Sequence, residues 1–308
     1  MRITHQMTAN NAIHSMSENL EKVSNLQSKL STQKKFQVAS EDPARASTSL
    51  SLRSNLKTLE SYADTAETTR NWMTATDNAF DKMDELGVQA NNLILRGIND
   101  SLSGSERANS LATEMQDILN QAVELGNTSV NGQYIFSGYQ VNSKAFELVN
   151  SATTLLDYQG NAFTPKVVNY LGDSGIMPRN LGPDQSVTLN VRGDQALNGI
   201  LQNLITATNA LKQNDTATLQ TLLTGLKSSF TTMGEYRTSN GARMRQVESA
   251  ADFLSTMQIE TKSLFSKNED MNMAEGITLL ANQQTTYDAV LQVSQRAISA
   301  LSLFDYMK

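Results

Sequence analysis

Both ends of the chain carry apolar side chains in a heptad pattern, and this pattern limits the possible folds more than any other feature. Steps of three and four residues alternate along each end, which is the spacing that lets one helix lie along another. Residues 1–39 and 269–308 are therefore expected to form a terminal coiled coil, with the rest of the chain looped out between them. The predicted seam consists of Ile13, Met16, Leu20, Val23 and Leu30 near the start and of Ile277, Leu280, Tyr287, Leu291, Ile298 and Leu301 near the end, where Gln284 and Ser294 interrupt it.

The last helix carries a second apolar seam that adjoins the first on a helical wheel. A face this wide predicts contacts with the N-terminal helix and with neighbouring subunits together, and one thick core contact is the alternative. A single such helix is marginal in water, so we expect each end to be unfolded in an isolated monomer until something covers it. The second seam consists of Val290, Val293, Ala297, Ala300 and Phe304.

Composition excludes several classes of partner. The net charge is -6 and no basic run occurs, so nucleic acid is not an expected partner. No apolar stretch reaches the ~20 residues that span a bilayer, so no membrane partner is expected. The first residues lack the apolar core and cleavage site of a secretory signal. Cysteine is absent, which excludes disulfides and thiolate metal sites.

Helix signals mark the chain on both sides of its middle. Asp42 can cap a helix and Pro43 suits its first position, and the apolar pattern then runs to Arg96, which corresponds to roughly 80 Å of helix. Ser103 and Glu106 have the spacing of a capping box that opens a further helix. We expect that helix to end at Gly126, acting as a C-cap.

The middle of the chain changes composition. Residues 131–195 hold three of the four prolines and seven of the sixteen glycines, and short apolar runs there look like strands between turns. We expect a β-rich outer domain at 131–196 that folds independently. Helical pattern returns at Leu197, and Asn214 and Asp215 can end one helix and cap the next. A helical rod domain is expected from 40–130 and 197–268.

A search for chemistry finds no catalytic, cofactor-binding or metal-binding residues. The two histidines, His5 and His14, lie near the start without an acidic cluster beside them. No phosphate-binding loop with a following Lys and Ser/Thr is present, and no nucleophile elbow occurs. We therefore expect a structural protein without a cofactor, and not an enzyme.

Three stretches resemble the bacterial flagellin family. The segment from Leu30-Ser31-Thr32 through Ser40-Glu41-Asp42-Pro43-Ala44-Arg45-Ala46 is similar to the family's N-terminal region, as is Asp84-Glu85-Leu86-Gly87-Val88-Gln89-Ala90-Asn91 further along. The end, from Ala281-Asn282-Gln283-Gln284 through Ser302-Leu303-Phe304-Asp305-Tyr306, resembles the family's C-terminus.

One segment is more specific within the family. The run Asn127-Thr128-Ser129-Val130-Asn131-Gly132-Gln133-Tyr134-Ile135-Phe136-Ser137-Gly138 resembles the N-T-x-x-x-G-x-Y-x-F-x-G pattern of the branch that joins the flagellar hook to the filament. Filament-forming members usually lack the Tyr-x-Phe-x-Gly part, and the small middle insert also fits the junction branch. Residues 141–196 carry no recognisable motif.

The resemblance implies a mostly α fold with a β-rich insert: a terminal coiled coil, a long helical bundle rod and a small outer β domain. It implies a structural adaptor between hook and filament, and a filament-forming flagellin with a small outer domain is the alternative. The implied location is the extracellular bacterial flagellum, reached through the flagellar type III export apparatus without a cleaved signal peptide.

The resemblance also implies a set of partners. These are a homo-oligomeric ring, a neighbouring hook-associated protein on the hook side, flagellin or the filament cap on the distal side, and a flagellar export chaperone at the C-terminal helix. The candidate residues for assembly and chaperone binding are Ile13, Met16, Leu20, Val23, Leu280, Tyr287, Leu291, Val293, Ile298, Leu301 and Phe304.

Overall fold

The computed structural model describes residues 3–99 and 101–306, with side chains described for residues 7, 10–99 and 101–296. The chain divides into two compact units. One consists of Met1–Leu59 with Thr256–Lys308, and the other of Glu60–Ser255. The two longest helices, α2 (Pro43–Ile98) and α7 (Thr216–Glu269), contribute residues to both units. The predicted boundaries of a coiled coil, a rod and an outer domain stay a prediction.

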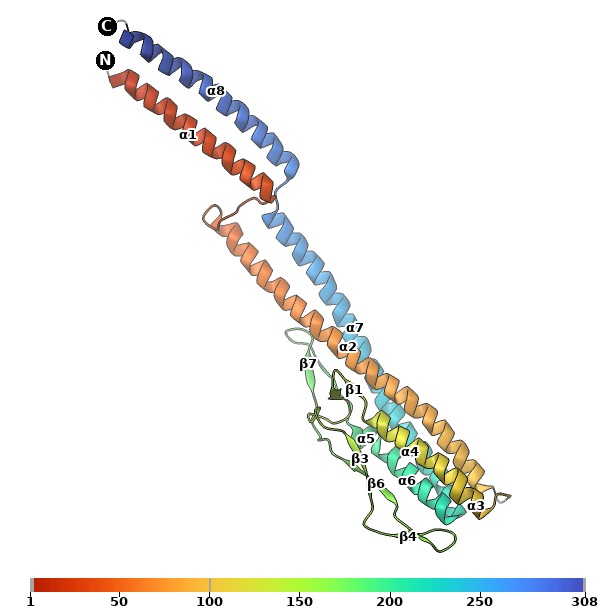
Figure 1. Ribbon diagram of the computed structural model, residues 1–308. Helices are drawn as coiled ribbons and strands as arrows, with labels where there is room; N and C mark the ends of the chain where they lie inside the picture. The colour runs from red at the N-terminus through yellow and green to blue at the C-terminus, as the bar shows by residue number, and fades with distance from the viewer. Residues whose placement is uncertain (1–2, 100, 307–308) are drawn as a thin grey trace. The chain divides into compact units, whose positions relative to one another are not determined.

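The first unit contains the two terminal helices, which lie side by side (Figure 1). They are α1 (Ile3–Thr32) and α8 (Met273–Tyr306). The start of α2 is capped as the sequence predicts, because the Asp42 carboxylate accepts a hydrogen bond from the Arg45 backbone N–H at 3.0 Å and Pro43 is the first helical residue. The heptad pattern thus predicts the helices of this unit correctly.

Between its two long helices the second unit contains several shorter ones. The predicted capping box is confirmed, since the Ser103 hydroxyl and the Glu106 carboxylate each accept a hydrogen bond from the other's backbone N–H. A π-helical turn follows that the sequence does not predict. The short helices and this turn are α3 (Gly104–Glu106), the π-helical turn Arg107–Leu111, α4 (Ala112–Gly126), α5 (Gly193–Ala196) and α6 (Asn198–Gln213).

The π-helical turn places Arg107 against the end of α2. Its guanidinium donates to the carbonyls of Gly97 and Asn99 at 2.7 and 2.6 Å and to the side chain of Asn214 at 2.7 Å. The Gly97 carbonyl belongs to the last turn of α2, where no intrahelical donor is left for it, and Asn99 directly follows the helix. Arg107 therefore caps α2 from a distance in the sequence. Asn214 itself ends α6 in a left-handed conformation, and Asp215 caps α7, as predicted.

The β region of the second unit consists of paired short strands. Among the described residues, every named strand pairs antiparallel with one other strand and no larger sheet forms. The pairs are β1 (Ser129–Val130) with β2 (Gln133–Tyr134), β3 (Phe146–Asn150) with β6 (Lys166–Tyr170), β4 (Leu155–Leu156) with β5 (Ala162–Phe163), and β7 (Pro178–Asn180) with β8 (Ser186–Thr188).

The β region has no core of its own, which corrects the expectation that it folds independently. Phe136 is fully buried, and its ring lies 5.5 Å from that of Phe80 on α2. Phe146 packs on Tyr170 with ring centroids 5.3 Å apart, and both belong to the same hydrophobic core as helices α2, α4, α6 and α7. Two-stranded sheets this short cannot bury enough apolar surface alone, so the helices supply the remainder.

Gly126 ends α4 as predicted but for a different reason. Its backbone is not left-handed, so it does not act as a glycine C-cap. A Cβ at this position would lie 2.8 Å from the ring of Phe146, and no side chain fits there. The following Asn127 fixes this packing by exchanging hydrogen bonds with the backbone of Phe146 at 2.8 and 2.9 Å.

The predicted fold class, mostly α with a small β region, is confirmed. Within the described residues, no helix combines the length and apolar character that a bilayer crossing requires.

Candidate assembly surface of the terminal helices

Helices α1 and α8 run antiparallel and meet along one face of each. Near one end, the Ser294 hydroxyl lies 3.4 Å from the Ala12 carbonyl. Near the other end, the Leu30 side chain lies 2.8 Å from the position that a Cβ on Gly276 would take. Buried and half-buried residues recur every three or four positions and mark this face. They are Ala12, Met16, Asn19, Val23, Leu26 and Leu30 on α1, and Gly276, Leu280, Gln283, Tyr287, Val290 and Ser294 on α8.

The observed seam is rotated from the predicted one. Of the predicted residues, Met16, Val23, Leu30, Leu280 and Tyr287 lie in the seam, and Leu291 lies half-buried at its edge. Ile13 and Leu20 do not, because 49% and 51% of their surfaces are exposed, and Val293 is 65% exposed. The side chains of Ile298, Leu301 and Phe304 lie outside the described residues.

Polar residues that do not belong to the apolar heptad pattern lie in the seam instead. The Gln283 amide donates to the Asn19 side-chain oxygen at 2.8 Å across the two helices. Ser294, treated in the sequence as an interruption of the seam, is only 3% exposed. A search restricted to apolar spacing misses such positions, although Asn19 and Ser294 each stand three or four residues from an apolar seam member.

The residues left outside the seam form an exposed apolar surface on both helices. Large exposed apolar side chains of this kind mark contact sites when they gather on one element. We call the exposed residues Ile13, Leu20, Ile277 and Val293 together the outer apolar surface. Ile13 and Leu20 share one face of α1, whereas Ile277 and Val293 lie on opposite flanks of α8. Because α1 and α8 already cover each other along a different face, this surface is available to other chains.

A charged junction ties the terminal pair to the ends of α2 and α7 within the first unit. The Glu269 carboxylate, 5% exposed, contacts Lys34 at 2.9 Å and Arg53 at 3.4 Å. Backbone bonds add to it: Met271 donates to the Gln33 carbonyl and Lys35 to the Glu269 carbonyl, both at 2.8 Å. The junction therefore holds the C-terminal end of α1 and the N-terminal end of α8 through ion pairs and backbone hydrogen bonds.

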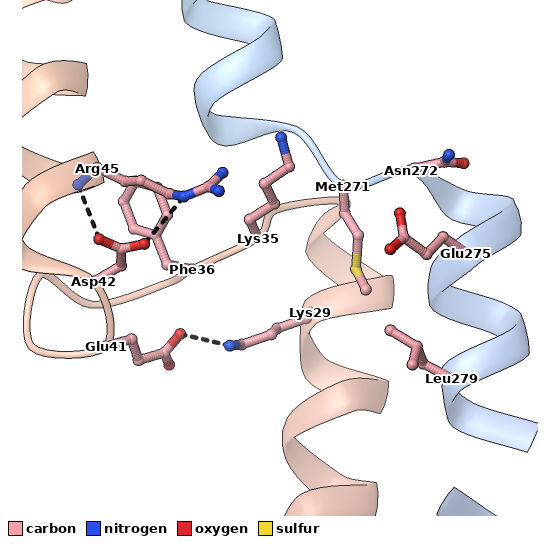
Figure 2. Close-up of a pocket in the computed structure, with 10 residues that line it drawn as sticks. All are labelled: Lys29, Lys35, Phe36, Glu41, Asp42, Arg45, Met271, Asn272, Glu275 and Leu279. Atoms are coloured by element: carbon pink, nitrogen blue, oxygen red, sulfur yellow. Dashed lines mark hydrogen bonds and ion pairs between the residues drawn. The ribbon is translucent and has the colours of Figure 1, made fainter. Parts of the chain in front are cut away.

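A cleft of about 400 Å³ opens beside this junction (Figure 2). Three acids line it, Glu41, Asp42 and Glu275. Two of them are already engaged, since Glu41 pairs with Lys29 at 3.0 Å and Asp42 with Arg45 at 3.1 Å. The hydrogen bond from Lys29 lowers the pKa of the Glu41 carboxyl. With cations on Glu41 and Asp42, the cleft offers no free carboxylate cluster to a metal ion, and no group of three or more metal-ligating side chains occurs in the described part of the chain.

A second charged cluster joins α2 to α7 in the second unit. Arg237 donates to Asp77 and Asp81 at 2.9 Å and to Asp84 at 3.2 Å, and the hydrogen bond to Asp77 raises the pKa of the guanidinium. The aspartates lie on one face of α2, so a single arginine fixes the alignment of the two helices. His14, by contrast, is an exposed residue beside Glu18, and His5 lies outside the described side chains.

Comparison with known proteins shows which proteins the chain is similar to. The model of the bacterial flagellin N-terminal helical region matches residues 3–141. Flagellar hook-associated protein 3 of Salmonella typhimurium is 24% identical to the chain, over 99% of both. The chain is thus similar to the flagellin family over residues 3–141 and to a flagellar hook-associated protein over nearly its whole length.

Other comparisons find the same kind of relative and solved structures of the same fold. Flagellar hook-associated protein 3 of Escherichia coli is 28% identical over 70% of this chain and 71% of that protein. Among solved structures of the same fold, a putative flagellar hook-associated protein from Vibrio parahaemolyticus has a TM-score of 0.64 at 15% identity, covering 75% of this chain and 100% of that one. Bacillus cereus FlgL has a TM-score of 0.55 at 21% identity, covering 70% and 99%.

Proposed function

We propose that this chain belongs to the flagellin family and is the structural adaptor that joins the flagellar hook to the filament. The observation that carries the proposal is the match to a flagellar hook-associated protein 3 along nearly the whole chain. A filament-forming flagellin is less favoured, because both curated relatives reported above are hook-associated proteins. The protein belongs to the flagellum.

The adaptor needs surfaces for neighbours on two sides and for copies of itself. The outer apolar surface of α1 and α8 supports contacts in a ring of identical chains, since Ile13, Leu20 and Val293 are exposed in a single chain. A hook-associated protein would lie on the hook side, and flagellin or the filament cap on the distal side. The role is structural and not enzymatic, without a metal or cofactor.

Export as an unfolded chain through the flagellar type III apparatus requires a cover for the C-terminal helix before assembly. A flagellar export chaperone would bind the apolar positions of α8 from Leu291 and Val293 onward, including Ile298, Leu301 and Phe304. The same residues would contact neighbouring chains after export, so the chaperone prevents early association in the cell.

Deleting the gene tests the adaptor role. Cells without the chain should keep their hooks, lack filaments and release flagellin monomers into the medium, because flagellin is exported but has no base to polymerise on. Complementation with the unchanged gene is the control. Normal filaments on the deletion cells would refute the adaptor role, and loss of filaments with no flagellin in the medium would favour the filament-forming alternative.

Chaperone binding is tested by the double variant Leu291→Ala with Leu301→Ala. Truncating central apolar anchors weakens such interfaces, so affinity for the cognate chaperone should fall at least about tenfold in a titration of the purified pair. The matched control is Val88→Ala, which truncates an exposed residue in the other compact unit. Unchanged affinity of the double variant would place the chaperone site elsewhere.

A further inference from the structure

The terminal helices could meet along two faces, and the chain uses the less apolar one. Successive residues of a helix lie about 100° apart around its axis, so Ile13 and Leu20 are one residue away from Ala12 and Asn19. Both possible seams share Met16 and Val23. The observed seam adds Ala12 and Asn19 to them, and the other would add Ile13 and Leu20.

Apolar burial alone favours the unused face. Burying Ile13, Leu20 and more of Leu291 would remove more apolar surface from water than burying alanine, serine and amide side chains. The unused seam would also take in Gln27 and Gln284, which are exposed here, and their amides would have to leave water. The gain in apolar burial and the cost of burying these amides oppose each other, so a specific contact must decide which of the two faces is used.

The contact present at the observed face is the hydrogen bond between Gln283 and Asn19. It joins the two helices at 2.8 Å between half-buried side chains, and it satisfies a donor and an acceptor inside the seam. Buried Ser294 adds a second polar contact nearer the free ends of the helices, on the Ala12 carbonyl. Single polar pairs in a helical seam are known to specify alignment at a cost in stability.

We propose that the Asn19–Gln283 hydrogen bond selects the faces on which α1 and α8 meet and so keeps Ile13 and Leu20 turned outward. The pair acts as a positioning device, because it sets the rotation of each helix about its own axis. Its consequence for assembly, that the outward residues are presented to a second copy of this chain, rests on the proposed function. The choice of face within one chain does not.

Cysteine pairs can report the face, since the chain has no cysteine of its own. Ala12→Cys with Ser294→Cys reports the observed face, and Ile13→Cys with Leu291→Cys reports the unused one. Each pair is placed in the full-length chain, which is oxidised under identical conditions. Disulfide formation is then measured by the mobility of the chain on a non-reducing gel.

The faces should exchange when the polar pair is removed. With Asn19 and Gln283 intact, the first pair should crosslink more than the second. In the background Asn19→Leu with Gln283→Leu, the ratio of the two yields should shift toward the unused face by about tenfold. The swapped background Asn19→Gln with Gln283→Asn, which keeps an amide on each helix, should restore the original ratio.

Matched substitutions at outward positions provide the control. Asn10→Leu with Gln292→Leu changes the same residue types at exposed sites and should leave the ratio unchanged. A ratio that does not respond to the leucine pair, equal crosslinking at both faces of the unchanged seam, or no crosslinking at either face would each overturn the proposal. Because no outcome depends on hook or filament, failure here is distinguishable from failure of the adaptor role.

Discussion

Truncating Phe146 tests whether the β region and the helices share one core. The side chain is 1% exposed and packs on Tyr170, Gly126 and Gly193, the last two being too close to accept a Cβ. Because two of these neighbours are glycines with no side chain to fill the space, Phe146→Ala should cost about 3–5 kcal/mol of unfolding free energy. For a unit of this size, each 1 kcal/mol lowers the melting temperature by roughly 2–4 °C.

The assay is thermal melting followed by the helical circular dichroism signal of the full chain. Phe146 lies on a strand, so a shared core predicts that the helical transition of residues 60–255 moves down by roughly 6–20 °C. The control is Leu156→Ala on β4, where the side chain is 59% exposed and the expected change is within about 0.5 kcal/mol. An unchanged helical transition in Phe146→Ala would show that the β region folds independently, and the packing argument would fail.

Two further predictions concern single positions in the same unit. Gly126→Ala should lower its unfolding free energy by about 1–3 kcal/mol in urea, because the new Cβ meets the Phe146 ring. Gly234 lies in open space in the middle of α7, and Gly234→Ala should raise the unfolding free energy by about 0.5–1 kcal/mol. Changes of the same sign in both variants would refute the steric reasoning. Burial raises the pKa of the Tyr170 phenol from 10.0 to about 12, so its contribution to stability is present below about pH 10, the pKa of an unfolded tyrosine, and is lost as the pH rises toward 12. Urea unfolding across this range should show that loss in the parent chain and not in Tyr170→Phe, and identical pH profiles would contradict it.

The helices could be predicted from the sequence because their signals are local. The cap at Asp42, the capping box from Ser103 to Glu106 and the turn at Asn214 each depend on side chains within a few residues of the backbone groups they bind. The same holds for the heptad pattern, which needs no knowledge of the partner. Such local interactions can be predicted without knowing how the rest of the chain folds.

Features that depend on distant residues could not be predicted. The rotation of the terminal seam is set where Asn19 meets Gln283, and nothing in either heptad reveals that the two amides face each other. Gly126 looks like a helix terminator until Phe146 is placed against it. No sequence signal distinguishes Arg107 from the other arginines, although it caps α2 through the carbonyls of Gly97 and Asn99.

Immunogold labelling of intact flagella tests the central claim, that this chain joins hook to filament, most directly. Antibodies would be raised against residues 141–190, a segment with exposed side chains such as Leu156 and Ile176. An adaptor predicts gold particles confined to a narrow band between hook and filament in electron micrographs. Particles distributed along the whole filament would contradict the account and identify the chain as a filament subunit.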